Sequence, residues 1–262
     1  MVVEAWKPVM EAGASDLLLF GSPVFHEGME RLLHEIHDAI QAESPYLVMT
    51  INVDMALEII DNTAFRQIYR SCDIRLLDGM PLVMLARAIG KPASRNTGSD
   101  LLPRAVEYGS RLGWRIVIAG GRDGVSAAAA RHLTEQFPSS HVSAIPFPDV
   151  TSVDDLASER FVSALAKGKP DLVFLCLGAP KQERWFAHWK AKLPPAVYVG
   201  AGAAVDFAAG EKLRAPKLVQ RIGLEWMWRL ALEPRRLSFR YLVRGPRFGR
   251  VILETMWNRV CH

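Results

Sequence analysis

Short apolar runs alternate with amphipathic segments along most of the chain. The apolar runs are bounded by Gly, Pro or Asp and are mostly rich in β-branched residues, as buried parallel strands are. The expected strands are Tyr46–Ile51, Ile74–Leu77, Arg115–Ala119, Val142–Ile145, Asp171–Leu177 and Val197–Gly200. Apolar residues at helical spacing predict helices over Asp54–Arg70, Pro81–Ile89, Ser99–Leu112, Asp123–Gln136, Val153–Ala166 and Gln182–Lys192. This alternation predicts an α/β fold with a parallel sheet and right-handed crossovers.

The pattern changes in the last fifth of the chain, where no further strand is expected. Helical spacing resumes over Lys217–Leu232 and again over Arg235–Val260. Breaks are expected at three positions, Pro234, Pro246 and Gly249. We therefore divide the chain into a body, residues 1–210, and a helical appendage, residues 211–262, rather than into two domains.

Composition narrows the class of protein. Of 262 residues, 50% are hydrophobic, which is too many for a disordered chain, and 23% are charged, which is too many for a multi-span membrane protein. The early apolar run Leu17–Phe20 is too short for an export signal. The three cysteines are widely spaced and include no CxxC pair. These features predict a cytoplasmic protein.

The net charge of +4 conceals an uneven distribution. The appendage holds 12 Lys and Arg against 4 Asp and Glu, a net charge of +8, so the body carries −4. A basic appendage on an acidic body indicates an anionic partner, either a membrane surface or phosphate groups. An ordinary solvated arginine-rich helix has the same composition, and charge alone does not decide between the two.

Polar residues follow the first two predicted strands, where the ligand crevice of a parallel sheet lies. Thr50 and Asn52 share one face of the first strand, although Asn52 or Asp54 alternatively caps the next helix. Asp78 comes directly after the second strand, before Gly79 and Pro81. A carboxylate in this place is suited to general base catalysis, or else serves the turn as an N-cap.

Further candidates occur in later loops. Arg95 precedes a helix that Ser99 or Asp100 is expected to cap, an arrangement suited to an anion or simply to a polar surface loop. Gly120 and Gly121 lie in a Gly-rich turn, but Ala119 replaces the first Gly of a GxGxxG fingerprint and no acidic residue follows at the required spacing. NAD binding is therefore disfavoured, which leaves a phosphate contact or a plain tight turn.

Two more strand ends carry candidate ligand groups. Lys181 and Gln182 start a helix after Pro180, where a diphosphate or a sugar could be held. Gly202 allows close approach to a ligand, and Asp206 could accept hydrogen bonds from a nucleotide or cap a short helix. The seven histidines form no metal-binding pattern, and no HExxH, GxSxG or P-loop motif occurs.

Taken in order, these segments resemble the WecG/TagA/CpsF family of bacterial glycosyltransferases over roughly residues 45 to 245. The matching body segments are Thr50-Ile51-Asn52, Leu77-Asp78-Gly79-Met80-Pro81, Arg95-Asn96-Thr97-Gly98-Ser99-Asp100-Leu101, Gly120-Gly121 with Gly124-Val125, Gly178-Ala179-Pro180-Lys181-Gln182-Glu183, Gly200-Ala201-Gly202, Val205-Asp206-Phe207 and Ala209-Gly210. The matching appendage segments are Arg214-Ala215-Pro216, Gly223-Leu224-Glu225-Trp226 with Arg229, and Glu233-Pro234-Arg235-Arg236. No single segment is decisive, but the ordered set is highly specific.

The resemblance implies a Rossmann-like body that transfers a sugar from a UDP-sugar, with inversion, to a saccharide on an undecaprenyl diphosphate lipid. It implies no metal, no cofactor beyond the donor, and an anionic membrane surface as a partner on the inner face of the plasma membrane. Asp78 looks like the general base. The other residues carried over as catalytic are Thr50, Gln182, Arg229 and Arg236. The substrate-binding set is Asn52, Arg95, Gly120, Gly121, Lys181, Gly202, Asp206, Arg214 and Arg240.

A non-catalytic module that binds nucleotides or phosphates and docks on membranes is the alternative hypothesis. It predicts UDP binding without sugar transfer. Under either hypothesis no nucleic acid partner is expected, and a homo-oligomer is compatible with the sequence. The residues do not choose among an N-acetylmannosamine-type sugar, its uronic acid and glucose.

Overall fold

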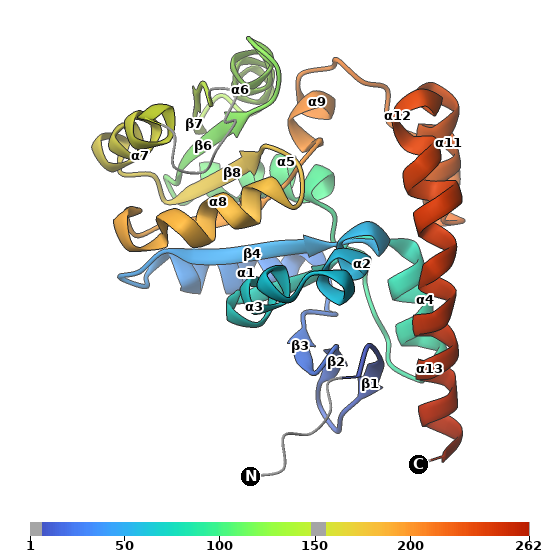
Figure 1. The fold of residues 1–262 in the computed structure, drawn as a ribbon. Coiled ribbons are helices and arrows are strands. Elements are labelled where there is room, and N and C mark those ends of the chain that lie inside the picture. Colours follow the sequence, from blue (N-terminus) through green and yellow to red (C-terminus); the bar gives the residue numbers. More distant parts are fainter. Residues whose placement is uncertain (1–6, 148–155, 262) are drawn as a thin grey trace.

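Six parallel strands form the central sheet, in the order β5-β4-β9-β8-β6-β7 (Figure 1). The computed structural model describes residues 7–147 and 156–261. The strands are β4 (Tyr46–Ile51), β5 (Ile74–Leu77), β6 (Arg115–Gly120), β7 (His141–Ile145), β8 (Leu172–Cys176) and β9 (Val197–Gly200). Each end lies within one residue of the range expected from the sequence, so the predicted α/β fold is confirmed.

Helices cover both faces of this sheet (Figure 1). They are α1 (Met29–Ile40), α2 (Val53–Asp61), α3 (Thr63–Ser71), α4 (Met80–Ala88), α5 (Gly98–Ser110), α6 (Val125–Gln136), α7 (Leu156–Gly168), α8 (Lys181–Trp189) and α9 (Ala204–Ala208). Strand β4 shows how the two layers arise, because Leu47, Met49 and Ile51 enter one core cluster and Val48 enters the other. The helix predicted over Val153–Ala166 is α7, and residues 153–155 lie outside the described residues.

One predicted helix, Asp54–Arg70, is wrong in extent because the chain breaks at Asn62. Asn62 has an extended backbone, and its side-chain oxygen accepts a hydrogen bond from Phe65 N at 3.0 Å. It therefore ends α2 and caps α3. The asparagine itself indicated a helix boundary in the sequence, but the apolar spacing continues across it and favoured a single helix.

A small antiparallel sheet at the N-terminal end was not predicted. It consists of β1 (Met10–Ala12), β2 (Leu17–Leu19) and β3 (Ser22–Val24). Strands of three residues are too short to show a period of two, so the sequence pattern missed them. Leu17, Leu19 and Val24 are nonetheless buried in the same core cluster as the helices beneath the main sheet.

After Pro234 the appendage is more continuous than the sequence suggested, whereas the single helix predicted over Lys217–Leu232 is wrong, because the chain turns at Gly223, whose φ is 79°. The elements of the appendage are α10 (Lys217–Arg221), α11 (Glu225–Leu232), α12 (Pro234–Ser238), a π-helix (Phe239–Arg244), a 3₁₀ turn (Gly245–Arg247) and α13 (Phe248–Cys261). The break expected at Pro234 is confirmed, whereas Pro246 and Gly249 do not interrupt the helical run. The π turn, closed by Gly245 N on Arg240 O, and the 3₁₀ turn after it accommodate a proline that has no N–H to donate.

The appendage stands along one side of the body (Figure 1). Phe248 and Val251 of α13 are buried in the same cluster as the body helices, and Thr255 Oγ1 accepts a hydrogen bond from Met10 N at 3.0 Å. Within the described ranges, no helix combines the length and hydrophobicity that crossing a bilayer requires. The two parts of the chain therefore share one hydrophobic core.

Candidate active site

A cavity of about 430 Å³ lies between the carboxyl ends of β4 and β5 and the appendage. The body lines it with Asn52, Val53, Asp54, Asp78, Gly79, Met80, Pro81 and Arg95. The appendage lines it with Gly223, Glu225, Trp226, Arg229, Arg240, Tyr241, Gly245, Pro246, Phe248, Gly249 and Ile252. The cavity thus brings together five of the predicted site residues: Asn52, Asp78, Arg95, Arg229 and Arg240.

Asp78 is held at the floor of this cavity by the end of the sheet. Its backbone N donates to Ile51 O at 2.9 Å. Gly79, not Asp78, is the N-cap of α4 and makes no side-chain cap, so the structure does not support the N-cap alternative for Asp78. Burial raises the pKa of Asp78 to about 6, although nearby arginines, Arg95 foremost, oppose the rise. Such a carboxylate can accept a proton near neutral pH.

Asn52 satisfies both sequence interpretations at once. Its side-chain oxygen accepts hydrogen bonds from Asp54 N and Met55 N, both at 3.1 Å, and so caps α2. The same oxygen accepts a third hydrogen bond, from Arg240 Nη2, at 3.1 Å. Capping fixes the side chain in the cavity wall, where it contacts the appendage.

Three arginines surround Asp78 in the cavity wall. Arg95 reaches it from the loop after α4, and its Nη1 pairs with Glu225 Oε2 at 3.0 Å. Arg229 of α11 lies over the Phe207 ring, 6.0 Å from its centroid. Arg240 comes from the π-helix. Guanidinium groups that converge from separate elements suit an anionic ligand such as a diphosphate.

Thr50 and Gln182 do not line this cavity. The Thr50 hydroxyl is buried and donates to Gly200 O at 2.7 Å. Gln182 is buried as well, and its Oε1 accepts from Gly178 N and Gly202 N, both at 3.2 Å. These two side chains bond to loop and strand backbone at the carboxyl edges of β8 and β9 and do not reach the cavity wall.

The remaining glycines and Lys181 lie along the same sheet edge but outside the cavity. Gly120 has a φ of 103°, and a Cβ there would lie 2.8 Å from the Cys176 backbone, so only glycine fits. Gly121 faces Val205 in the same way, at 3.1 Å. Lys181 is exposed at the start of α8. The tight-turn interpretation of the Gly-rich segment thus has direct support.

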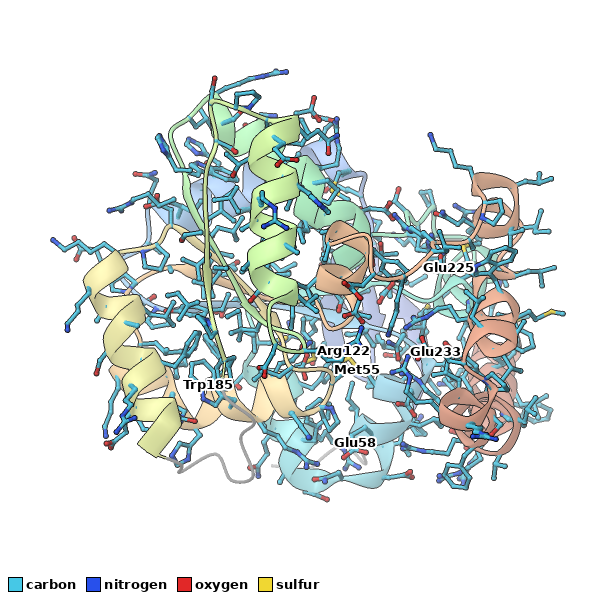
Figure 2. All side chains as sticks on the ribbon, turned by 90° about the horizontal axis from the view of Figure 1, so that it is seen from above. Met55, Glu58, Arg122, Trp185, Glu225 and Glu233 are labelled. Atoms are coloured by element: carbon cyan, nitrogen blue, oxygen red, sulfur yellow. The ribbon has the colours of Figure 1, made fainter. Side chains whose placement is uncertain are left out.

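Three further charged residues from the predicted set lie outside the cavity wall and pair with other side chains. Asp206 pairs with Lys212 at 2.8 Å, and Lys212 also reaches Glu233 at 3.3 Å. Glu233 in turn pairs with the predicted residue Arg236. These contacts run from α9 to the start of α12, and Figure 2 shows Glu233 on the side of the appendage that faces the body. Asp206 therefore connects the body to the appendage through Lys212, whereas Arg236 pairs within the appendage.

Arg214, the third of these residues, grips the start of α5. Its two terminal nitrogens bond to the two carboxylate oxygens of Asp100 at 2.7 and 2.8 Å. Although burial opposes it, the hydrogen bonds from Arg214 and Thr97 lower the pKa of Asp100. The expected helix caps, Ser99 and Asp100, are wrong, because Thr97 Oγ1 accepts from Asp100 N and caps α5.

The appendage also contacts the body along an acidic face of α2. Arg244 Nη1 lies 3.0 Å from Asp54 Oδ1, and Arg244 Nη2 lies 3.6 Å from Glu58 and 3.8 Å from Asp61. Arg247 makes two hydrogen bonds to Asp61, at 2.9 and 2.7 Å. Since Asp54, Glu58 and Asp61 are three or four residues apart, they share one face of the helix. We call these three residues the α2 acidic face.

Sequence reasoning missed several cavity residues. Glu225 was seen only as part of the Gly223–Trp226 segment, and Asp54 only as a capping candidate. Trp226 and Tyr241, whose rings meet edge to face at 5.9 Å, add an aromatic wall. Among the residues that the structure describes, no group of His, Cys, Asp or Glu side chains is arranged to hold a metal ion.

Comparison with known proteins now places the chain. The model of the glycosyl transferase WecG/TagA/CpsF family matches residues 17–261. The chain belongs to this family. A relative from Bacillus spizizenii, named N-acetylglucosaminyldiphosphoundecaprenol N-acetyl-beta-D-mannosaminyltransferase, is 29% identical over 208 residues, covering 79% of this chain and 78% of the relative. A protein of the same name from Bacillus subtilis is 26% identical over 216 residues, covering 81% of each chain.

The match to the WecG/TagA/CpsF family includes both the body and the appendage. It begins at Leu17 in β2 and ends at Cys261, the last residue of α13. Both walls of the cavity therefore lie inside the shared region. As a family member, the chain is a glycosyltransferase, and the family resemblance stated from its motifs is confirmed.

Proposed function

We propose that the protein is an inverting glycosyltransferase that moves a sugar from a UDP-sugar to a polyprenyl-diphosphate-linked saccharide in cell-envelope or exopolysaccharide synthesis. The observation that carries this proposal is the half-buried Asp78 in a cavity walled by Arg95, Arg229 and Arg240. A proton acceptor next to concentrated positive charge is what direct displacement from a nucleoside diphosphate sugar needs. The names of the two relatives support the lipid-linked acceptor and an N-acetylmannosamine-type donor.

In the proposed reaction, the oxygen of an acceptor hydroxyl attacks the anomeric carbon of the donor sugar. Asp78 takes the proton from that hydroxyl. The new carbon–oxygen bond forms on the face opposite to the bond that breaks, which inverts the configuration. The electron pair of the broken bond leaves with the UDP diphosphate. Guanidinium groups of Arg95, Arg229 and Arg240 stabilise the negative charge that develops there.

We further propose that the appendage rests on the inner leaflet of the plasma membrane. Among the described residues, all but two of the exposed large hydrophobic side chains lie in residues 211–262, and the exceptions are Met84 and Leu112. On the helical run after Pro234 they form two groups ten positions apart, Phe239, Leu242 and Val243 and then Leu253, Met256 and Trp257; the exposed Ile252 also lines the cavity and is not counted here. We call these six residues the apolar stripe. A stripe of this kind suits an interfacial helix.

The test is a transfer assay with purified protein, a set of UDP-sugars and a polyprenyl diphosphate carrying one N-acetylglucosamine. Mass spectrometry of the lipid product is expected to show the addition of one sugar from one preferred donor, with UDP released in equal amount. UDP binding by calorimetry without any lipid product would favour the non-catalytic membrane-docking module instead. Product formed without UDP release would contradict the proposed donor.

A further inference from the structure

Glu225 brings an appendage carboxylate into the cavity, and the mechanism above does not use it. It is the first residue of α11, two positions after Gly223. Gly223 has a φ of 79°, and a Cβ there would lie 3.3 Å from Met80 Cβ, so this turn packs closely against the residue that starts α4. The approach places Glu225 at the cavity wall, and Figure 2 shows it where the appendage meets the body.

The body fixes the loop that carries Arg95, the partner of Glu225, through the next residue. Arg95 precedes Asn96, whose N donates to Leu77 O at 2.9 Å and whose side-chain amide donates to Glu27 O at 2.9 Å. These bonds hold the loop beside the end of β5, next to Asp78. The Arg95 side chain, 15% exposed, meets Glu225, 17% exposed, at 3.0 Å. A pair this shielded from water is more persistent than a surface ion pair.

We propose that Glu225 is a positioning residue that orients the Arg95 guanidinium beside Asp78, so that the site is complete only when the appendage is docked. This inference rests on the proposed function and adds a role for a residue that the mechanism leaves unassigned. The appendage would then supply the Glu225 carboxylate as well as its arginines, and this carboxylate orients Arg95 of the body. Arg95 alone, on a loop, has several rotamers to sample, and the ion pair selects one.

The charges around Asp78 make this role measurable. Arg95, Arg229 and Arg240 lower its pKa, and Glu225 raises it; Arg214 also interacts with Asp78 from the start of the appendage. In E225Q, which removes the negative charge but keeps an acceptor for Arg95, the pKa of Asp78 is therefore expected to fall. In a profile of kcat/KM against pH, the acidic limb is expected to move to lower pH.

The experiment compares E225A and E225Q with wild type in the full-length protein. Alanine removes both charge and acceptor, so kcat/KM is expected to fall about 10- to 100-fold. Glutamine keeps an oxygen that can accept from Arg95, so it is expected to recover most of that loss while still shifting the acidic limb. The matched control is E254Q, another appendage glutamate paired with an arginine, Arg250, but outside the cavity. It is expected to behave as wild type.

A readout without turnover keeps this inference separate from the proposed function. Backbone amides of residues 223–232 are expected to exchange hydrogen faster in E225A and in R95Q, and no faster in the double variant than in either. Equal exchange in all four proteins, or an unchanged acidic limb with wild-type kcat/KM in E225A, would overturn the role of Glu225. Absence of transfer by wild type with every donor would instead reject the proposed function, and the exchange experiment would still decide the ion pair.

Discussion

The carboxyl edge of the body and the helical appendage meet at one cavity, but they are built in opposite ways. Polar side chains at the sheet edge bond mainly to nearby backbone, as Thr50 does with Gly200 and Gln182 with Gly202. Polar side chains of the appendage reach across to the body, as Arg240 does with Asn52 and Arg244 with Asp54. The polar contacts of the sheet edge thus lie within the body, whereas those of the appendage depend on its packing against the body.

This contrast changes the role that we assign to the positive charge of the appendage. Its charge of +8 suggested arginines directed at an anionic membrane. Arg240, Arg244 and Arg247 instead contact Asn52 or the α2 acidic face, and Arg259 donates to Ala88 O. What the appendage turns toward solvent is chiefly apolar. Part of the positive charge thus joins the two parts of the chain, and exposed arginines such as Arg235 and Arg250 lie among the hydrophobic side chains of the outer surface.

The largest expected effect comes from the body side of the cavity. D78N is expected to reduce transfer about 10²- to 10⁴-fold, because it removes the proton acceptor, and to leave UDP binding nearly unchanged. The exposed Asp16 provides the control, D16N, which should retain full activity. Normal turnover by D78N in the lipid-product assay would remove Asp78 from the base role.

The same variant is expected to be more stable than wild type at alkaline pH. Because burial raises the pKa of Asp78 from 3.8 to about 6, its contribution to folding is favourable below pH 4 and is lost as pH rises through 6. D78N should therefore gain about 1–3 kcal/mol of unfolding free energy at pH 8 and about half as much at pH 5. Denaturant titrations at the two pH values measure the difference in unfolding free energy between D78N and wild type. An equal difference at both pH values would contradict this expectation.

The next effect tests the outer face of the appendage. Leu253 and Trp257, which are 72% and 71% exposed, belong to the apolar stripe. The double variant L253S/W257S is expected to bind vesicles at least about tenfold more weakly, since each side chain loses part of a transfer free energy of about 1.5–3 kcal/mol. L112S, at an exposed apolar residue of the body, is the matched control.

Charge on the same face should matter less. Removing the exposed Arg250 in R250Q costs about 1 kcal/mol of attraction to anionic lipid, or about fivefold in vesicle binding. Vesicle sedimentation with neutral and anionic lipid separates the two contributions. A larger loss in R250Q than in L253S/W257S would reverse the comparison between charge and apolar surface.

The smallest effect concerns the α2 acidic face. R244Q is expected to lower the free energy of unfolding by about 1 kcal/mol, because a partly shielded arginine loses three carboxylate neighbours. Salt screens such contacts, so the difference from wild type should shrink between 0.1 and 1 M NaCl. R235Q, at an exposed arginine of the same helical run, should change little. Equal losses in both variants would show that the acidic face does not fix the appendage.

Local pattern was sufficient wherever neighbours in sequence decide the structure. The six strands of the main sheet follow from apolar runs such as Leu172–Cys176, which is buried along its whole length. Asp78 could be singled out because it directly follows such a run. The pattern gave the wrong result at Asn62, where one capping side chain ends a helix, and at Pro246, where a turn of π-helix lets the helical run continue. Such local features do not change the spacing of apolar residues, so they leave no periodic signal.

By itself, the sequence determined the sheet, the family resemblance and the arginine-rich appendage, because hydrophobic spacing and ordered motifs are properties of the chain. Only the tertiary structure decided which candidates share a cavity. Arg95 and Glu225 are 130 residues apart in sequence and 3.0 Å apart in space, while Gln182 turns into the sheet edge. Such pairings depend on how the appendage packs against the body, and long-range packing is encoded in no local pattern.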